Sequence, residues 1–282
     1  MSRMNGKTCV VTGSNSGIGK ETVLALSGMG ATVVMVVRDR ERGEKARAEI
    51  VSETGNDAIH LMICDLSSMD SVRQFAKEFR SKYDRLHVLV NNAGVFVGKR
   101  EVTVDGFERT LLVNYFAPFL LTHELLPLLK SSAPSRIINI GSGMHRSGRI
   151  DFGDLQCRKC NAMKAYANSK LILTTYTYEL SRRLQGTGVT VNVVEPGFVA
   201  TNLGNNSGSR LYSLAFLIAR PFQISAKKAA ETHVYLASSP KVDGVTGKCF
   251  SELKETTTAQ ASYDQQTQRR LYDTTLELLS LV

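Results

Sequence analysis

Residues 10–22 are VVTGSNSGIGKET, and this stretch decides the fold. An apolar run leads into three closely spaced glycines, and a helix-forming sequence follows them. Such a turn lets backbone N–H groups approach a pyrophosphate at a helix N-terminus. The spacing is Gly13-x3-Gly17-x-Gly19, and its strand–turn–helix setting favours nucleotide binding over a turn used for packing alone. The residues expected to line the nucleotide are Gly13, Ser14, Asn15, Ser16, Gly17, Ile18 and Gly19.

Short apolar runs alternate with amphipathic stretches from residue 7 to about residue 194. The expected strands are Thr8–Val11, Thr32–Val37, Ala58–Cys64, Leu86–Val90, Arg136–Ile140 and Val189–Val194, with a last one at Lys248–Phe250. Their near-continuous Val, Ile and Leu content predicts strands buried on both faces. Helical spacing marks Glu41–Glu53, Ser71–Lys82 and Ala226–Ser238. The pattern predicts the α/β class: one domain over residues 1–282, with a doubly wound parallel sheet, the Rossmann fold.

Two segments depart from this alternation. Residues 202–225 form a long insert that contains the apolar stretch Leu211–Phe222, and this predicts a substrate lid. An alternative interpretation is that the outer face of the insert dips into a membrane to collect lipid-like substrates. Residues 252–282 are a polar tail that ends in an amphipathic helix, expected to cover an apolar patch of the same domain.

Composition excludes several classes of protein. The chain has 282 residues, is 43% hydrophobic and carries a net charge of +9, but its basic residues are interleaved with acidic ones along residues 38–49. That interleaving is typical of a solvated helix face and argues against a nucleic-acid partner. The polar first residues do not form a secretory signal, and no apolar run has the length of a membrane span. We expect a cytoplasmic protein without a transmembrane segment, with peripheral membrane contact as an alternative.

Five cysteines are scattered along the chain, which predicts a reduced intracellular protein. Cys157 and Cys160 have CxxC spacing. A redox pair is expected at a βα turn, and a zinc site would need a second pair. We therefore interpret the spacing as a coincidence within a loop and expect no metal site.

The end of the second expected strand bears on the cofactor. Arg38 stands where a carboxylate would accept from the ribose 2′-OH of NAD. A guanidinium cannot accept but binds a 2′-phosphate through two hydrogen bonds, which favours NADP. The neighbouring Asp39 keeps NAD open as an alternative if the strand ends one residue later.

Further ligand contacts are expected after other strands. Asp65, followed by Leu66, comes directly after the third strand and can accept from the adenine amino group. Asn92, Ala93 and Gly94 follow the fourth strand, where small residues let the backbone approach the ribose. These turns lie at the carboxyl ends of strands, where open α/β sheets bind ligands.

Three side chains suggest the chemistry. Ser142 ends the fifth strand segment, and Tyr166 and Lys170 share one face of the next helix because they are four residues apart. A turn that binds a nucleotide, combined with a phenol that can release its proton, is typical of a carbonyl or alcohol oxidoreductase.

The motifs taken in order resemble those of the short-chain dehydrogenase/reductase family. The resemblance covers roughly residues 7–250 and rests on the glycine turn, Asp65, the NNAG run at 91–94, Asn114, Ser142, Tyr166-x3-Lys170 and Pro196-Gly197-x3-Thr201. Residues 37–39, 141–145 and 180–184 resemble the retinol-dehydrogenase-like branch. The chain departs from it at Gly141, where a second serine is common, and Ser16 stands at a position that is often basic in NADP users.

The resemblance implies roles for the matching residues. Tyr166 would be the general acid/base, with its pKa lowered by the Lys170 ammonium and the positive nicotinamide. Ser142 would bind the substrate oxygen, Lys170 the nicotinamide ribose, and Asn114 would continue a water-linked proton path. Val199 and Thr201 would meet the carboxamide and phosphate.

The leading hypothesis is an NADP-dependent oxidoreductase acting on a hydrophobic alcohol, aldehyde or ketone, retinoid-like or lipid-like. The alternative is a catalytically silent nucleotide sensor or scaffold, which would be expected to lack at least one of Ser142, Tyr166 and Lys170; all three are present. Family resemblance and the apolar run 171–173 also predict a homo-oligomer, although core packing would explain the run equally well.

Overall fold

An eight-stranded sheet forms the centre of the protein. The computed structural model describes residues 4–199 and 223–281. The strands lie in the order β3-β2-β1-β4-β5-β6-β7-β8, and only the β7–β8 pair is antiparallel. The strands are β1 (Thr8–Thr12), β2 (Thr32–Val37), β3 (Ile59–Ile63), β4 (Val88–Asn91), β5 (Ser135–Ile140), β6 (Val189–Val194), β7 (Cys249–Ser251) and β8 (Lys254–Thr256).

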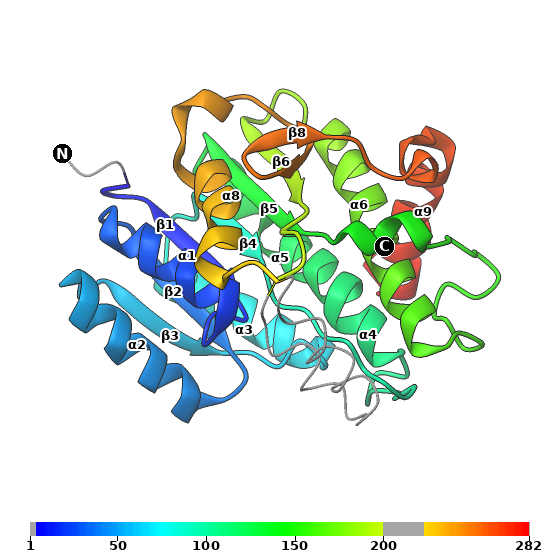
Figure 1. Ribbon diagram of the computed structural model, residues 1–282, viewed down its shortest axis with the longest axis horizontal. Helices are drawn as coiled ribbons and strands as arrows, with labels where there is room; N and C mark the ends of the chain where they lie inside the picture. Colours follow the sequence, from blue (N-terminus) through cyan, green and yellow to red (C-terminus); the bar gives the residue numbers. More distant parts are fainter. Residues whose placement is uncertain (1–3, 200–222, 282) are drawn as a thin grey trace.

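Helices cover both faces of this sheet (Figure 1). One face carries α1 (Gly17–Gly28), α2 (Arg40–Thr54) and α8 (Ala226–Ser238). The other carries α3 (Met69–Lys82), α4 (Arg109–Leu111), the π-helical turn η1 (Leu112–Phe116), α5 (Ala117–Ser131) and α6 (Ala162–Arg183), with α9 (Gln265–Leu278) packed on the outside of α6. Short 3₁₀ turns lie at η2 (Gly143–Ser147), η5 (Pro240–Val242) and η6 (Gln260–Tyr263).

Alternate strand residues fill two separate cores. In β1, Val10 belongs to the core beneath α3, α5 and α6, while Cys9 and Val11 belong to the core beneath α1, α2 and α8. All three side chains are fully buried. Because both faces are covered, polar alternation is absent, which is why the strands appear in the sequence as continuous apolar runs. The predicted doubly wound α/β fold is confirmed.

The expected elements agree closely with the observed ones. The bounds of the six strands from Thr8 to Val194 and of the helices named in advance differ by no more than two residues at an end. The sequence analysis did not identify β8, because Lys254–Thr256 is short and its three residues are polar. Such an edge strand is held by its antiparallel pairing with β7, not by an apolar pattern of its own.

The tail acts as a cover for the domain, as predicted. Leu271 on α9 is fully buried in the core on the α6 side of the sheet. Tyr115 and Thr275 hydrogen-bond through their hydroxyls at 2.6 Å, and the Arg183 guanidinium lies 3.9 Å from the centre of the Tyr272 ring. Of the expected lid, residues 202–222 lie outside the described part of the chain.

One prediction about apolar length is wrong. Among the described residues, the helical run Arg109–Ser131 is long and apolar enough to cross a membrane by length and composition. In the fold it lies against the sheet, and 72% of its most apolar window is buried. The run is apolar because it is buried between the sheet and its neighbouring helices.

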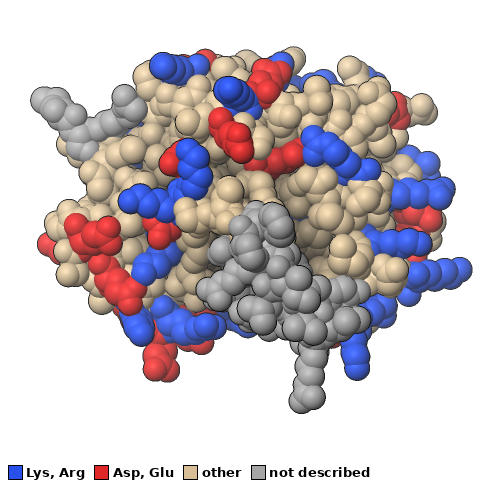
Figure 2. Space-filling view, viewed as in Figure 1, with Lys and Arg blue, Asp and Glu red and all other residues tan. Residues whose placement is uncertain are grey.

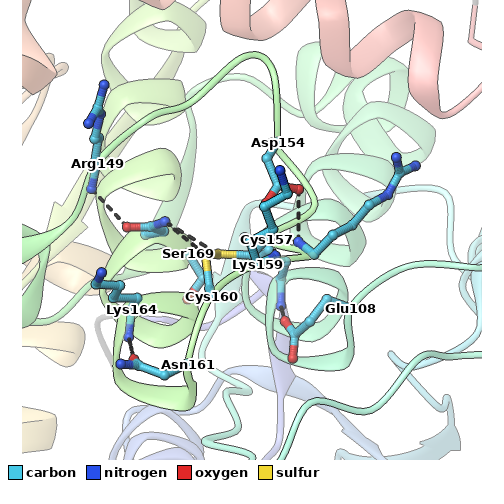
Figure 3. Close-up of a disulfide and its surroundings, with 12 residues drawn as sticks. Glu108, Arg149, Asp154, Cys157, Lys159, Cys160, Asn161, Lys164 and Ser169 are labelled. Carbon is cyan, nitrogen blue, oxygen red and sulfur yellow. Dashed lines mark hydrogen bonds between the residues drawn. A yellow bond between two sulfur atoms is a disulfide. The ribbon is translucent and has the colours of Figure 1, made fainter.

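The interpretation of Cys157 and Cys160 as a coincidence is also wrong, because a disulfide joins them (Figure 3). Cys157 has a left-handed backbone, with φ of 54°. The Asp154 carboxylate accepts hydrogen bonds from the N–H groups of Arg158 at 2.8 Å and Lys159 at 3.0 Å. This local turn brings the two sulfurs together, and the spacing of the cysteines does not reveal such a conformation.

Charged side chains are dispersed over the surface. Figure 2 shows side chains of both signs interspersed on the visible face, including the part of it formed by α2. This distribution follows the interleaved charges that the sequence places between residues 38 and 49.

Candidate active site

A cavity of about 540 Å³ opens at the carboxyl ends of the parallel strands. It lies where the strand order reverses between β1 and β4, the usual ligand position in such sheets. Every residue expected to contact the cofactor lines it, apart from Ser14 and Thr201. The members named in advance are Gly13, Asn15, Ser16, Gly17, Ile18, Gly19, Arg38, Asp65, Leu66, Asn92, Ala93, Gly94, Ser142, Tyr166, Lys170 and Val199. Thr201 lies outside the described residues.

The glycine turn is pressed against the loop that follows β4. A Cβ added at Gly13 would stand 2.8 Å from the Ala93 Cα, and one at Gly19 would stand 2.5 Å from the Asn92 Nδ2. The Thr12 Oγ1 accepts hydrogen bonds from the N–H groups of Asn92 and Ala93, both at 3.0 Å. Side chains larger than hydrogen are therefore excluded from both glycine positions.

This turn is suited to an anionic group. Ser16 gives α1 no side-chain cap hydrogen bond, so the first N–H groups of the helix border the cavity. The Ser14 hydroxyl is fully buried and has no hydrogen-bond partner among the described residues. The N–H groups of Gly17, Ile18 and Gly19 at the cavity fit the pyrophosphate of a dinucleotide, whereas Ser14 does not line the cavity.

Two arginines border the opposite end of the cavity. Arg38 follows β2, and Arg42 lies in the first turn of α2. Between them, the Asp39 Oδ1 accepts from the Arg42 N–H at 3.1 Å and caps the helix. Arg42 was not among the residues predicted from the sequence. The feature that could have identified it is its position four residues after Arg38, one helical turn further on.

Asp65 shapes the neighbouring wall. Its Oδ1 accepts from the Ser67 N–H at 2.9 Å and from the Ser67 hydroxyl at 2.7 Å. Its own N–H donates to the Ser71 Oγ at 2.9 Å. These bonds fix the carboxylate at the cavity beside Leu66.

Ser142 and Tyr166 meet across the cavity. Ser142 begins the turn η2, where its Oγ accepts from the Met144 N–H at 3.3 Å. Tyr166 lies in the second turn of α6. Burial raises the pKa of Tyr166, and a hydrogen bond with Ser142 opposes that effect.

The predicted lowering of the Tyr166 pKa by Lys170 is not seen in this structure. The Lys170 Nζ donates to the Ile140 carbonyl at 2.7 Å and lies 5.8 Å from the centre of the Tyr166 ring. Lys170 is itself only 4% exposed, and burial lowers its pKa to about 8. Desolvation therefore governs both groups, whereas the sequence predicts only their mutual attraction.

Asn114 hydrogen-bonds to Ser169, which lies between Tyr166 and Lys170 on α6. It lies in the π-helical turn η1, where its Oδ1 accepts from the Val95 N–H at 2.8 Å and its Nδ2 donates to the Ser169 Oγ at 3.1 Å. A Cβ added at Gly94 would stand 3.5 Å from the Asn114 Oδ1 and 3.6 Å from the Lys170 Nζ. Asn114 and Lys170 therefore both border the small space beside Gly94.

Gly141 departs from the resembling branch for a steric reason. A Cβ there would stand 2.9 Å from a methyl group of Val193 and 3.1 Å from the Val194 carbonyl oxygen. A serine here would require the Val193 side chain and β6 to shift by a few tenths of an ångström.

The cavity wall beside Tyr166 is apolar. Phe96 packs edge-on against the Tyr166 ring, with centroids 5.8 Å apart. Met144, Met163 and Phe198 line the same cavity, and the last two are exposed. The sequence analysis did not single out these four residues, which come from four separate loops or helix starts.

An ionic cluster around the buried Glu195 and His145 lies behind Ser142, with the exposed Arg146 as its third member, and it was not predicted from the sequence. The Glu195 carboxylate binds the His145 Nε2 at 2.5 Å and the Arg146 Nη1 at 2.8 Å. The His145 Nδ1 accepts from the Ala259 N–H at 3.3 Å, so the Nε2 carries the proton that is donated to Glu195. These two bonds lower the pKa of Glu195 against the opposing effect of burial, which is its largest single influence. The cluster fastens the Ser142 turn to the end of β6 and to the tail.

Comparisons with known proteins agree with this architecture. A family model described as "short chain dehydrogenase" matches residues 7–211. Retinol dehydrogenase 13 of Homo sapiens is 42% identical over 282 aligned residues, covering 98% of this chain and 85% of the relative.

Two solved structures are similar to most of the chain. An uncharacterised protein of Mycobacterium paratuberculosis is 29% identical with a TM-score of 0.79, covering 98% of this chain and 94% of its own. The RhlG/NADP active-site complex of Pseudomonas aeruginosa is 28% identical with a TM-score of 0.71, covering 89% of this chain and 96% of its own.

We predict that Glu195→Gln destabilises the protein by about 2 kcal/mol, because an amide nitrogen only donates and must face the donor of His145 or of Arg146. Chemical unfolding near neutral pH measures this. Since the pKa of Glu195 is lowered in the folded protein, its stabilising effect is complete above the ordinary carboxyl pKa of 4.5. The difference between wild type and variant should therefore shrink as the pH falls through the lowered pKa.

Glu255→Gln is the matched control. Glu255 pairs with Lys248 at 2.7 Å on the surface, where both side chains are about half exposed. Its loss should cost no more than about 0.5 kcal/mol. Equal destabilisation by the two substitutions would contradict a special role for the cluster around Glu195.

Proposed function

The chain belongs to the short-chain dehydrogenase family of oxidoreductases, and on that premise we propose that it transfers a hydride between NADP(H) and a hydrophobic alcohol, aldehyde or ketone. One observation carries the proposal. Ser142, Tyr166 and Lys170 line the same cavity as the glycine turn, so a proton donor and a dinucleotide cradle adjoin one space. The relative named retinol dehydrogenase supports a retinoid-like or lipid-like substrate class.

NADP is the proposed cofactor. The glycine turn and the N-terminus of α1 would hold its pyrophosphate, and Arg38 would bind the 2′-phosphate, with Arg42 beside it. Asp39 supports this choice, because one of its carboxylate oxygens already caps α2. The NADP named in the RhlG complex also supports it. When bound, the cofactor supplies or accepts the hydride.

The side chains of the protein would handle the proton. In the reducing direction, the Tyr166 hydroxyl would donate its proton to the carbonyl oxygen of the substrate. Ser142 would hydrogen-bond that oxygen and hold it near the phenol. Lys170 would bind the nicotinamide ribose hydroxyls, and Asn114, which also borders the space beside Gly94, would pass a proton on through water.

The apolar wall supports a hydrophobic substrate. Phe96 packs on Tyr166, and Met163 and Phe198 line the same cavity. Burying apolar substrate surface there would contribute about 25 cal/mol per Å². A panel of aldehydes and ketones of increasing apolar size, assayed with NADPH, tests the class of substrate. The same panel separates the oxidoreductase from a silent nucleotide sensor, which would bind NADPH without turnover.

We predict that Tyr166→Phe lowers turnover by about 100-fold or more, because it removes the proposed proton donor and keeps the ring that packs on Phe96. NADPH binding, measured by fluorescence titration, should be retained. Tyr178→Phe is the control, since Tyr178 lies on the same helix but its hydroxyl binds Thr258 at 2.8 Å, away from the cavity. Substantial residual turnover in Tyr166→Phe would rule out Tyr166 as the acid.

We predict that Arg38→Asp shifts preference from NADPH toward NADH by about tenfold or more, because a carboxylate repels a 2′-phosphate and accepts from a 2′-OH. Arg42→Ser should weaken NADPH binding and leave NADH binding unchanged. Arg40→Ser is the control, because Arg40 is exposed and does not line the cavity. Dissociation constants for NADPH and NADH, measured for the wild type and each variant, test this prediction. Equal affinities of the wild type for the two cofactors would contradict it.

A homo-oligomer is proposed from the family resemblance alone. The residues that suggested it, Leu171, Ile172 and Leu173, are fully buried within the chain, so core packing accounts for them. Light scattering at micromolar concentration tests the proposal, and a monomer would refute it. The cytoplasmic location is likewise a proposal, with peripheral membrane contact as its alternative. That alternative rests on the net charge of +9 and on the apolar stretch Leu211–Phe222, which lies outside the described residues.

A further inference from the structure

The Cys157–Cys160 disulfide lies next to the helix that carries Tyr166 and Lys170 (Figure 3). It closes the loop that leads from η2 into α6. The other three cysteines, Cys9, Cys64 and Cys249, are buried and free. Burial raises the pKa of Cys9 and Cys64 to about 12 and also raises that of Cys249, so these thiols are poor nucleophiles in the folded protein.

The disulfide itself is open to attack from one side. Cys157 is buried, but Cys160 is partly exposed, and the two residues between them, Arg158 and Lys159, are exposed cations. Cys160 immediately precedes Asn161, whose side chain caps the N-terminus of α6. Positive side chains and a helix N-terminus both stabilise a thiolate. An incoming thiolate therefore finds an accessible sulfur in a positive environment.

We propose that Cys157–Cys160 is a thiol–disulfide exchange site that accepts dithiol reductants and, by opening and closing, sets the position of the first turns of α6. In reduction, one thiolate of the dithiol attacks the Cys160 Sγ and forms a mixed disulfide, and Cys157 leaves as a thiolate and takes up a proton. The second thiolate of the dithiol then attacks the sulfur that the reductant contributed to the mixed disulfide. It forms the cyclic disulfide of the reductant and releases Cys160. Two electrons pass to the protein, and the dithiol is oxidised.

Asn168 links the disulfide to the helix. Its Nδ2 donates to the Cys157 Sγ at 3.3 Å and approaches the Cys160 Sγ at 3.7 Å, and its Oδ1 accepts from the Arg149 N–H at 2.8 Å. Asn168 thereby joins both sulfurs and the loop after η2 to the middle of the Tyr166–Lys170 span. Asn168 contacts the two sulfurs and the Arg149 N–H, and opening the disulfide separates the two sulfurs from each other.

The substrate end of the cavity should respond to this change. The first turns of α6 supply Met163 and Tyr166 to that end, whereas the glycine turn leads into α1 and Arg38 follows β2. Reduction should therefore affect the carbonyl substrate more than the cofactor. This coupling rests on the proposed function; the exchange chemistry does not. In a reducing compartment a disulfide is as a rule transient and redox-active, so exchange also reconciles the disulfide with the predicted cytoplasmic location.

Alkylation of the folded protein tests the exchange site. The full chain is treated with iodoacetamide, with or without prior dithiothreitol, and the labelled cysteines are identified by mass spectrometry. We expect no labelling without reductant, labelling of Cys157 and Cys160 after it, and labelling of all five cysteines only after unfolding. Labelling of the pair before reduction, or its resistance to dithiothreitol in the folded state, would overturn the proposal.

Hydrogen exchange and kinetics test the link to α6. Reduction should speed amide exchange over residues 162–166 and raise the KM for a carbonyl substrate by about tenfold, since small displacements of positioning groups cost that much. The Kd for NADPH should change by less than about twofold, because its proposed pyrophosphate and 2′-phosphate contacts lie at the glycine turn and Arg38, away from α6, and Lys170 lies beyond residues 162–166. Oxidation with glutathione disulfide should restore the original rate of amide exchange and the original KM.

The double variant Cys157→Ala/Cys160→Ala is the control and should not respond to reductant. An equal response in this variant, or unchanged hydrogen exchange and KM in the reduced wild type, would overturn the link. The wild-type comparison alone decides the matter if the variant does not fold. Should no carbonyl substrate turn over, labelling and hydrogen exchange still test this inference, and only the proposed function fails.

Discussion

The approach of Gly13 to Ala93 is the constraint on which the rest of the site depends. A Cβ at Gly13 would stand 2.8 Å from the Ala93 Cα, so the turn after β1 and the loop after β4 meet backbone to backbone. The Thr12 hydroxyl holds the two segments in this arrangement. The contact spans the point where the strand order reverses and leaves the start of α1 facing the cavity. A side chain here would separate the cradle for a dinucleotide from the groups that would act beside it.

Burial of Lys170 is the second feature of the site. An ammonium so thoroughly removed from water is costly unless it is hydrogen-bonded, and the Ile140 carbonyl at 2.7 Å provides that bond. Burial lowers the pKa of Lys170 to about 8, which is close enough to neutral pH for the ammonium to exchange its proton. The same burial raises the pKa of Tyr166 and keeps the phenol protonated. A protonated phenol is the form that a reductive step requires of a proton donor.

Ser142 and Tyr166 are each held in place by contacts of the segments that carry them. Behind Ser142, Glu195 connects the turn η2 to the end of β6, and His145 connects it to the tail through the Ala259 N–H. Beside Tyr166, the disulfide and Asn168 hold the start of α6 against the loop before it. The tail therefore stabilises the site as well as covering the core. Positioning of this kind matters because small displacements of reacting groups are costly.

The sequence by itself determined the layout of the domain and the identity of about half of the cavity residues. Local patterns suffice for this, because strands buried on both faces are continuously apolar and the turns at their carboxyl ends meet at one edge of a parallel sheet. The disulfide, Glu195, Arg42 and the apolar wall at Phe96 were not found in this way. Each depends on distances between segments or on a local backbone turn, as with the left-handed Cys157. The direction of the Tyr166 pKa was likewise decided by tertiary structure, because burial arises only when the chain has folded around the phenol.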